Sequence, residues 1–184
     1  REPLESGEIV VARARDRVRF PARFQLVAAM NPCPCGYLGD PTGRCRCSSE
    51  LIQRYRNKLS GPLLDRIDLH VTVAREATAL SPTGDHGPDS ATVARQVALT
   101  RERQQQRQGC ANAFLDLPGL RRHCGLSTAD EKWLENACER LMLSLRAAHR
   151  LLKVARTLAD LEEVEDIRRE HLAEALQYRP VGQE

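Results

Sequence analysis

The sequence lacks the phosphate-binding loop that P-loop nucleotide hydrolases require. That loop needs a Gly-Lys pair followed by Ser or Thr, and no Gly-Lys pair occurs in the 184 residues. No apolar run ends in Asp-Glu either, so the carboxylates that help to hold Mg²⁺ in such enzymes are also missing. We therefore expect no ATP hydrolysis by this chain alone, and weak nucleotide affinity at best.

Other absences narrow the class of protein further. No apolar run approaches the roughly 20 residues of a membrane-spanning helix, so no membrane partner is expected. The opening segment, REPLE, has no apolar core of the kind found in signal peptides, which favours the cytoplasm. The chain does not begin with Met, and we expect a segment cut from a longer protein. Aromatic residues make up only 4%, so any nucleic-acid contact is expected to be to the backbone.

What the sequence does contain is a soluble, globular composition with a small basic excess. Hydrophobic residues make up 41% and charged residues 29%, which excludes a disordered chain. The 28 Lys and Arg against 25 Asp and Glu give a net charge of +3. This balance permits nucleic-acid or phosphate partners without requiring them.

Four of the seven cysteines crowd into a Pro- and Gly-rich loop, residues 32–47. They form two C-x-C pairs separated by nine residues, namely Cys33, Cys35, Cys45 and Cys47. Four thiolates in one loop suit a tetrahedral, structural Zn²⁺ site, although the spacing is tighter than the usual C-x-x-C. The alternative is four free cysteines in an irregular loop. An odd count without a secretory signal argues against disulfides, and the remaining cysteines are expected to be ordinary core or surface residues, namely Cys110, Cys124 and Cys138.

The first part of the chain reads as strands mixed with short helices. We predict a basic hairpin over residues 8–20 and a strand buried on both faces over residues 24–30, FQLVAAM. A helix is predicted from Ser48 to about Leu59, followed by a helical turn over 63–67 and a second strand over 69–73.

The later part of the chain is helical in pattern. Residues 77–90 are rich in Pro, Gly, Asp and Ser and are predicted to be a linker. The predicted helices that follow cover residues 92–107, 127–141, 145–159 and 167–177. The fold class is therefore α/β plus all-α, with a strand-containing part over 1–76 and a small helical bundle over 91–184.

Two features of the first part could contact phosphates. Arginines alternate at period two along the hairpin, at positions 13, 15, 17 and 19, namely Arg13, Arg15, Arg17 and Arg19. Along an uninterrupted strand these would share one face and could grip DNA phosphates, although the turn interrupts the period. A charged hairpin can also simply deter edge-to-edge pairing. Asn31 directly follows the predicted strand 24–30, where ligands of parallel α/β sheets gather, but it could equally be a turn asparagine.

Two longer motifs make the pattern specific. Residues 29–37 read AMNPCPCGY and residues 59–69 read LSGPLLDRIDL. Together with the opening REPLE and with Ser144-Leu145-Arg146 and KVARTLADL over 153–161, they closely resemble the magnesium-chelatase-like AAA+ ATPases. The resemblance runs in the same order along almost the whole chain, and only residues 76–90 carry none of it.

The resemblance implies a C-terminal part of a ring-shaped, hexameric motor with ATP and Mg²⁺ as cofactors. Asn31 matches the sensor-1 asparagine, which orients the attacking water. Arg66 matches the arginine finger, which enters the neighbouring subunit's ATP site. Arg146 matches the sensor-2 arginine of the helical lid, with Arg150 one turn away as a competing candidate. The hairpin matches an insertion that faces the central channel in related motors.

Three functions remain open from the sequence. The first is a motor that acts on DNA, such as a helicase or branch-migration factor of natural transformation. The second is a chelatase-type motor that drives metal insertion. The third is a non-enzymatic zinc module that binds nucleic acid or protein. Without the resemblance, Arg66 reads as a surface ion pair with Asp65 or Asp68, and Arg146 as a solvated residue or a partner of Glu139.

Overall fold

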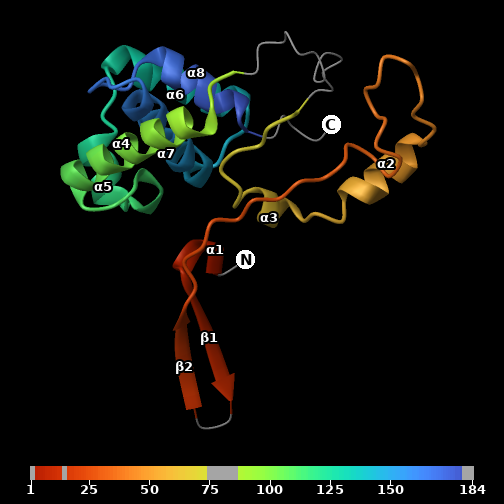
Figure 1. Cartoon of the computed structure of the whole chain (residues 1–184), viewed down its shortest axis with the longest axis horizontal. Helices are drawn as coiled ribbons and strands as arrows, with labels where there is room; N and C mark the ends of the chain where they lie inside the picture. The colour runs from red at the N-terminus through yellow and green to blue at the C-terminus, as the bar shows by residue number, and fades with distance from the viewer. Residues whose placement is uncertain (1–2, 14–15, 74–86, 180–184) are drawn as a thin grey trace. The chain divides into compact units, whose positions relative to one another are not determined.

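The computed structural model describes residues 3–13, 16–73 and 87–179 (Figure 1). The chain divides into two compact units, residues 1–67 and residues 68–184. Within the described ranges, none of the helices combines the length and apolarity that a bilayer crossing requires.

The first unit opens with the predicted hairpin, which the structure confirms. A short helix α1 (Pro3–Ser6) precedes strands β1 (Glu8–Arg13) and β2 (Asp16–Pro21), which pair antiparallel. Figure 1 shows the two strands as a narrow two-stranded ribbon, drawn in red. The register places Ile9 opposite Phe20 and Val11 opposite Val18.

Two short helices close the first unit. Helix α2 (Ser49–Arg56) begins where the sequence predicts, because the Ser48 hydroxyl accepts a hydrogen bond from the backbone N–H of Leu51 at 3.3 Å. It ends at Arg56, three residues before the predicted end. Helix α3 (Gly61–Leu64) begins two residues earlier than predicted, since Pro62 in its first turn has the backbone angle of a helix and no N–H to satisfy.

Both predicted strands beyond the hairpin are wrong. Residues 24–30 and 69–73 are irregular and pair with no strand among the described residues. Their apolar side chains are exposed, for instance Val27 at 83% and Val73 at 87%. A strand requires partners for its backbone N–H and C=O groups and cover for both faces. The described residues offer no strand partner to either segment, although the His70 N–H donates to the Tyr178 carbonyl at 2.7 Å, so neither segment forms a strand.

The second unit is a helical bundle, in agreement with the predicted pattern. Its helices are α4 (Ser90–Gln108), the 3₁₀ turn η1 (Asn112–Phe114), α5 (Leu117–His123), α6 (Thr128–Arg140), α7 (Leu145–Leu161) and α8 (Arg169–Gln177). Side chains of Asp89, Asp116, Ser127 and Ser144 cap four of them. Helix α4 ends at Gly109, whose φ of 74° is the left-handed conformation that glycine adopts most easily.

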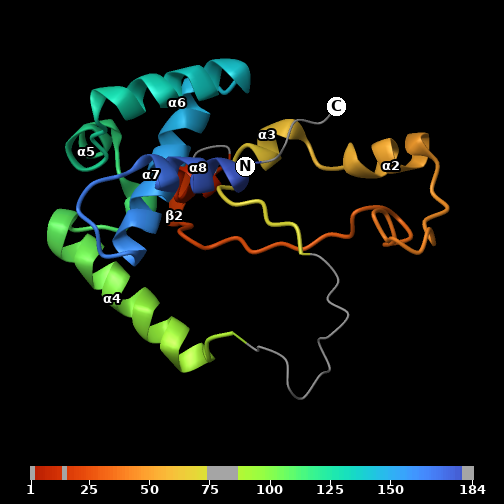
Figure 2. The same ribbon diagram turned by 90° about the horizontal axis from the view of Figure 1, so that it is seen from above.

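Helix α7 is the centre of this bundle. It packs against α4, η1, α5 and α8, and Figure 2 shows it passing between α4 and α6. The helix predicted over residues 145–159 buries Leu151, Ala155 and Ala159, which are at most 1% exposed, whereas Leu145, which its helical pattern also placed on the apolar face, is 74% exposed. Cys124, which is 5% exposed, belongs to the same core, and burial raises the pKa of its thiol to about 11.

One buried carboxylate ties the bundle together. Asp160 on α7 is 0% exposed. Its Oδ2 accepts hydrogen bonds from Arg107 Nη2 at 2.9 Å and Asn112 Nδ2 at 2.8 Å, and its Oδ1 accepts from Arg156 Nε at 3.1 Å. Burial alone would raise the pKa of Asp160. The hydrogen bonds from Arg107 and Asn112, with the charges of Arg156 and Arg107, outweigh burial and lower it.

We expect Asp160→Asn to destabilise the bundle by about 3–5 kcal/mol, because it leaves the guanidinium of Arg156, 3% exposed, buried without its counter-charge. Urea denaturation measures the loss. The matched control is Asp166→Asn on the surface, which should change the unfolding free energy by less than about 0.5 kcal/mol. The lowered pKa also predicts that the contribution of Asp160 is present at neutral pH and is lost as the pH falls through its folded-state pKa. Equal effects of the two variants would contradict a central role for this carboxylate.

Candidate functional site

The four cysteines of the 32–47 loop converge in the structure. Cys33 Sγ lies 3.3 Å from Cys35 Sγ and 3.8 Å from Cys45 Sγ, and Cys35 Sγ lies 3.7 Å from Cys45 Sγ. All four sulfurs, including that of Cys47, lie within 4.8 Å of one another. With Zn–S bonds of 2.3 Å, the sulfurs of a regular tetrahedral site are about 3.8 Å apart. This arrangement could therefore hold a metal ion.

Short turns bring the two C-x-C pairs together. The backbone N–H of Gly36 donates to the carbonyl of Cys33 at 3.0 Å, and Gly36 has a φ of 79°. Further along, Asp40 accepts from the Thr42 N–H at 2.8 Å and pairs with Arg44, whose guanidinium lies 4.5 Å from the centre of the Tyr37 ring. These contacts turn the chain so that the second cysteine pair returns to the first.

Hydrogen bonds make the thiols of the loop unequal. A hydrogen bond to the backbone of Tyr37, followed by the Cys33 thiol, lowers the pKa of Cys35 to about 6. A thiolate at neutral pH is the form that binds metals.

Asn31 lies against the first turn of this loop. Its side-chain amide is exposed to solvent and approaches Gly36. A Cβ atom at Gly36 would lie 3.8 Å from both Cγ and Nδ2 of Asn31. The structure thus places the candidate sensor asparagine beside the cysteine cluster, with Pro32 as the only residue between it and Cys33.

Arg66 lies two residues after the end of α3. Its backbone N–H donates to the carbonyl of Leu63 at 2.9 Å, and its Nη1 donates to the carbonyl of Pro62 in the same short helix. The side chain is half-buried. In this conformation Arg66 is folded back on its own turn.

The two candidate lid arginines differ in surroundings. Arg146 stands in the first turn of α7 and is exposed. Arg150, one turn later, is mostly buried and pairs with Asp68, with Nε 2.5 Å from Oδ1. Asp68, one suggested ion-pair partner of Arg66, is therefore bound to Arg150.

The hairpin separates its arginines into two faces. Directly opposed residues point to the same side of an antiparallel pair, so Ile9, Val11, Val18 and Phe20 share one face with Arg13 and Asp16. Arg17 and Arg19 lie on the other face, opposite Ala12 and Val10. A single arginine face containing Arg13 is therefore wrong, because the turn reverses the alternation. Arg15 lies outside the described residues.

Comparison with known families decides the identity of the chain. The family described as magnesium chelatase, subunit ChlI, matches residues 1–80, and its C-terminal counterpart, magnesium chelatase, subunit ChlI C-terminal, matches residues 87–179. The chain belongs to the magnesium chelatase family. The resemblance read from the sequence motifs is thereby confirmed.

Individual relatives within this family are similar over nearly the whole chain. The competence protein ComM of Haemophilus influenzae is 50% identical over 181 residues, which are 97% of this chain and 35% of that protein. YifB of Escherichia coli K12 is 49% identical over 183 residues, 98% of this chain and 36% of that protein. A Mycobacterium bovis protein, Mb2921c, is 42% identical over 99% of the chain. The chain spans about a third of the length of these relatives.

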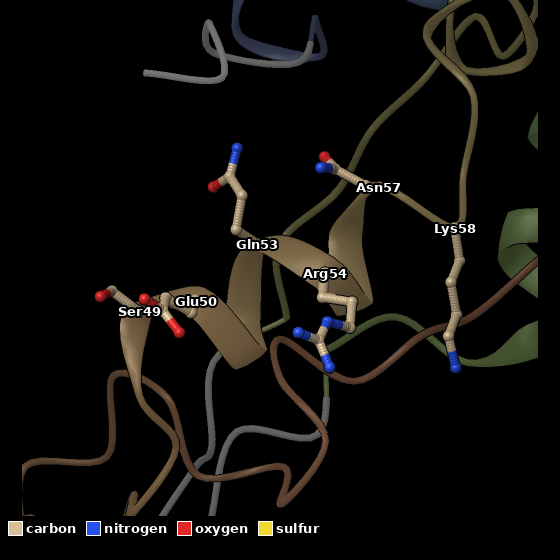
Figure 3. Close-up of a pocket in the computed structure, with 6 residues that line it drawn as sticks. All are labelled: Ser49, Glu50, Gln53, Arg54, Asn57 and Lys58. Atoms are coloured by element: carbon tan, nitrogen blue, oxygen red, sulfur yellow. The ribbon is translucent and has the colours of Figure 1, made fainter.

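Two further places in this family member were missed by sequence reasoning. A shallow hollow runs along α2, and Figure 3 shows its lining side chains, all from this helix or the residues just after it, namely Ser49, Glu50, Gln53, Arg54, Asn57 and Lys58. Its lining is one polar side of an amphipathic helix, a pattern visible in the sequence.

The second place is a cluster of Glu162, Glu170 and His171, whose side chains lie close enough to share a metal ion. Both ring nitrogens of His171 are already engaged. Nδ1 accepts from the Arg168 N–H at 2.9 Å, so Nε2 carries the proton and donates to Glu162 at 3.0 Å. The arrangement is a cap for α8.

Proposed function

We propose that this chain is the C-terminal portion of a hexameric AAA+ ATPase that moves on DNA, similar to ComM and serving as a helicase or branch-migration factor of natural transformation. The observation that carries the proposal is the 50% identity to a competence protein over 97% of the chain. The sequence motifs of the magnesium-chelatase-like ATPases fall in the same residues.

The two segments that have no strand partner among the described residues support a role as part of a larger α/β domain. Residues 24–30 and 69–73 have strand-like composition and exposed apolar side chains. Upstream strands would supply the hydrogen-bond partners and cover that the described residues do not. The chain's share of its relatives, about a third, leaves room for such strands and for the phosphate-binding loop. Residues 1–76 then complete the nucleotide domain, residues 77–90 link it, and residues 91–184 form the lid.

In this proposal ATP and Mg²⁺ bind to the upstream part, and the nucleotide supplies a phosphoryl group for transfer to water. Asn31 orients that water from the end of segment 24–30. Arg66 reaches the site of the neighbouring subunit, and Arg146 approaches the same phosphates from the lid, where a planar, permanently charged guanidinium suits spread negative charge. Arg146 is favoured over Arg150 because Arg150 is committed to Asp68.

We expect Arg66→Ala in the whole protein to lower DNA-stimulated ATP hydrolysis by about 10³-fold or more, the scale of arginine fingers. Arg146→Ala should also lower kcat, and Arg150→Ala should have a smaller effect. Steady-state hydrolysis assays measure these losses. The control is Arg121→Ala, an exposed arginine of α5.

A mixing experiment tests whether the finger acts between subunits. Arg66→Ala subunits combined with subunits that lack the upstream ATP-binding lysine should recover part of the activity, because each kind supplies what the other lacks. Unchanged hydrolysis in Arg66→Ala would make the finger assignment wrong. Loss without recovery on mixing would place Arg66 within its own subunit's site.

The hairpin supports DNA as the substrate of the motor. Arg17 and Arg19 occupy one exposed face, and Arg19 makes only a surface ion pair with Glu8 at 3.7 Å, which phosphate contacts can replace. Contacts of this kind hold the DNA backbone without reading sequence. Arg13 faces the other way, opposite Asp16.

We expect replacement of both Arg17 and Arg19 by alanine to weaken DNA binding uniformly across sequences. The slope of log K against log salt should become shallower by about 2, since each lost phosphate contact removes about 0.9. Fluorescence anisotropy over a salt series measures the slope. Arg13→Ala is the matched control from the opposite face and should change it less. A slope that becomes shallower by about 0.9 in Arg13→Ala alone, as expected for one lost phosphate contact, would rule out a single binding face.

The cofactor set of the proposal includes Zn²⁺ at the four cysteines. All four ligands come from the chain, so the site has no open position for catalysis and its role is structural. Under reducing conditions the chain should bind one Zn²⁺ and protect four of its seven thiols from a thiol reagent. Cys47→Ser should lower the metal content, and Cys110→Ser should not. A content near zero after chelator-free purification would reject the zinc site.

A further inference from the structure

The cysteine cluster contains a buried side chain. Among the described residues of 1–67, Cys33 alone is buried, at 0% exposure, whereas apolar side chains of the preceding segment are exposed, for instance Phe24 at 57% and Met30 at 52%. Segment 24–47 therefore has no hydrophobic core of its own in the described part of the unit. Its conformation depends on turns, on the Asp40 pairs and on the cysteines.

Contacts between thiols alone stabilise the loop only weakly. S–H groups donate and accept only weak hydrogen bonds, and four sulfurs within 4.8 Å of one another gain little from their mutual contacts. A divalent cation changes this, because it binds all four as thiolates and fixes the two C-x-C pairs to each other. The ordering of this loop is thus expected to follow metal occupancy.

Asn31 is close to this loop both in sequence and in space. Pro32 alone separates it from Cys33, and its amide lies against Gly36, the residue that follows Cys35. The Cys33–Gly36 turn, closed by the hydrogen bond from Gly36 N–H to the Cys33 carbonyl, therefore supports Asn31. Both thiols of that turn belong to the cluster.

We propose that the metal held by Cys33, Cys35, Cys45 and Cys47 is a clamp that positions the side-chain amide of Asn31. The proposal rests on the zinc site and on the role of Asn31 at the nucleotide, both proposed for this chain. Asn31 contacts the nucleotide site, and the cysteines are positioning residues that act through it. Loss of the metal slows hydrolysis by releasing Asn31, while ATP remains bound by the upstream part.

Nuclear magnetic resonance of the whole 184-residue chain tests the clamp directly. The side-chain amide signal of Asn31, assigned by its loss in Asn31→Asp, should shift on addition of one equivalent of Zn²⁺. Gly36→Ala should displace that signal in the zinc-loaded chain, because the added Cβ would stand 3.8 Å from the amide. Gly43→Ala is the matched control, since Gly43 also has a positive φ of 66° but faces open space.

The outcomes separate the clamp from the proposals beneath it. Zinc binding with an unmoved Asn31 signal overturns the clamp and leaves the zinc site standing. No zinc binding overturns both. Equal effects of the two glycine variants overturn the contact between Asn31 and the turn and attribute any change to backbone strain.

Hydrolysis by the whole protein gives a second, independent readout. Cys47→Ser, sixteen positions from Asn31, should lower kcat by about ten-fold or more while the KM for ATP changes by less than about two-fold. Cys47→His, which keeps a zinc ligand, should restore most of the rate. Because both residues act through one amide, the double variant with Asn31→Ala should be no slower than Asn31→Ala alone. Multiplied losses in the double variant, or a raised KM in Cys47→Ser, would overturn the clamp. Unchanged hydrolysis in Asn31→Ala would instead contradict the assignment of the chain to an ATP-driven motor.

Discussion

An extended chain is a stable strand only when a neighbour pairs with its backbone, and this constraint governs the first unit. Residues 24–30 are apolar enough for the centre of a sheet, yet the described chain offers them no ladder. In the hairpin each strand has its partner close by in the sequence, with Glu8 opposite Pro21 and Arg13 opposite Asp16, and the two strands pair. Segment 24–30 finds no strand partner among the described residues, and it remains irregular with exposed apolar side chains. The candidate nucleotide residues Asn31 and Arg66 lie in this under-supported part.

The helices of the second unit meet the same need for backbone hydrogen-bond partners within themselves. Helices satisfy their backbone groups within themselves, and the capping side chains of Ser127 and Ser144 complete the first turns. The bundle then needs only side-chain packing around α7, where Asp160 pairs with the buried Arg156 and the half-buried Arg107. The core residues of the bundle all lie between Cys110 and Leu176, so its packing draws on no residue of the first unit.

Sequence reasoning succeeded where the information is local. The hairpin and the long helices followed from short-range periodicity and caps, with helix boundaries mostly within two or three residues of those observed. It missed α5 and η1, although Asp116 followed by Leu117-Pro118 is a readable cap-and-proline start. It failed for segments 24–30 and 69–73. Their composition gives the propensity to form a strand, but a strand forms only where a second strand is available to pair with it.

In the candidate site, too, only the features that depend on nearby residues could be predicted from the sequence. The convergence of four cysteines could be expected from two C-x-C pairs in one turn-rich loop. The hairpin faces could not be read from arginine spacing, since a period of two does not continue across a turn. The ion pair between Arg150 and Asp68 joins residues 82 positions apart in the sequence, so no local sequence pattern could predict it.

The position of Arg146 connects stability to the proposed chemistry. It stands in the first turn of α7, where the helix dipole is positive and no acidic residue compensates it. The helix dipole alone makes a cation at this end unfavourable by about 0.3–1 kcal/mol. An approaching phosphate removes this cost, because it meets the guanidinium and the positive end of the helix together. In the proposed motor, nucleotide would therefore stabilise α7, which would give the proposed lid a physical reason to close on it.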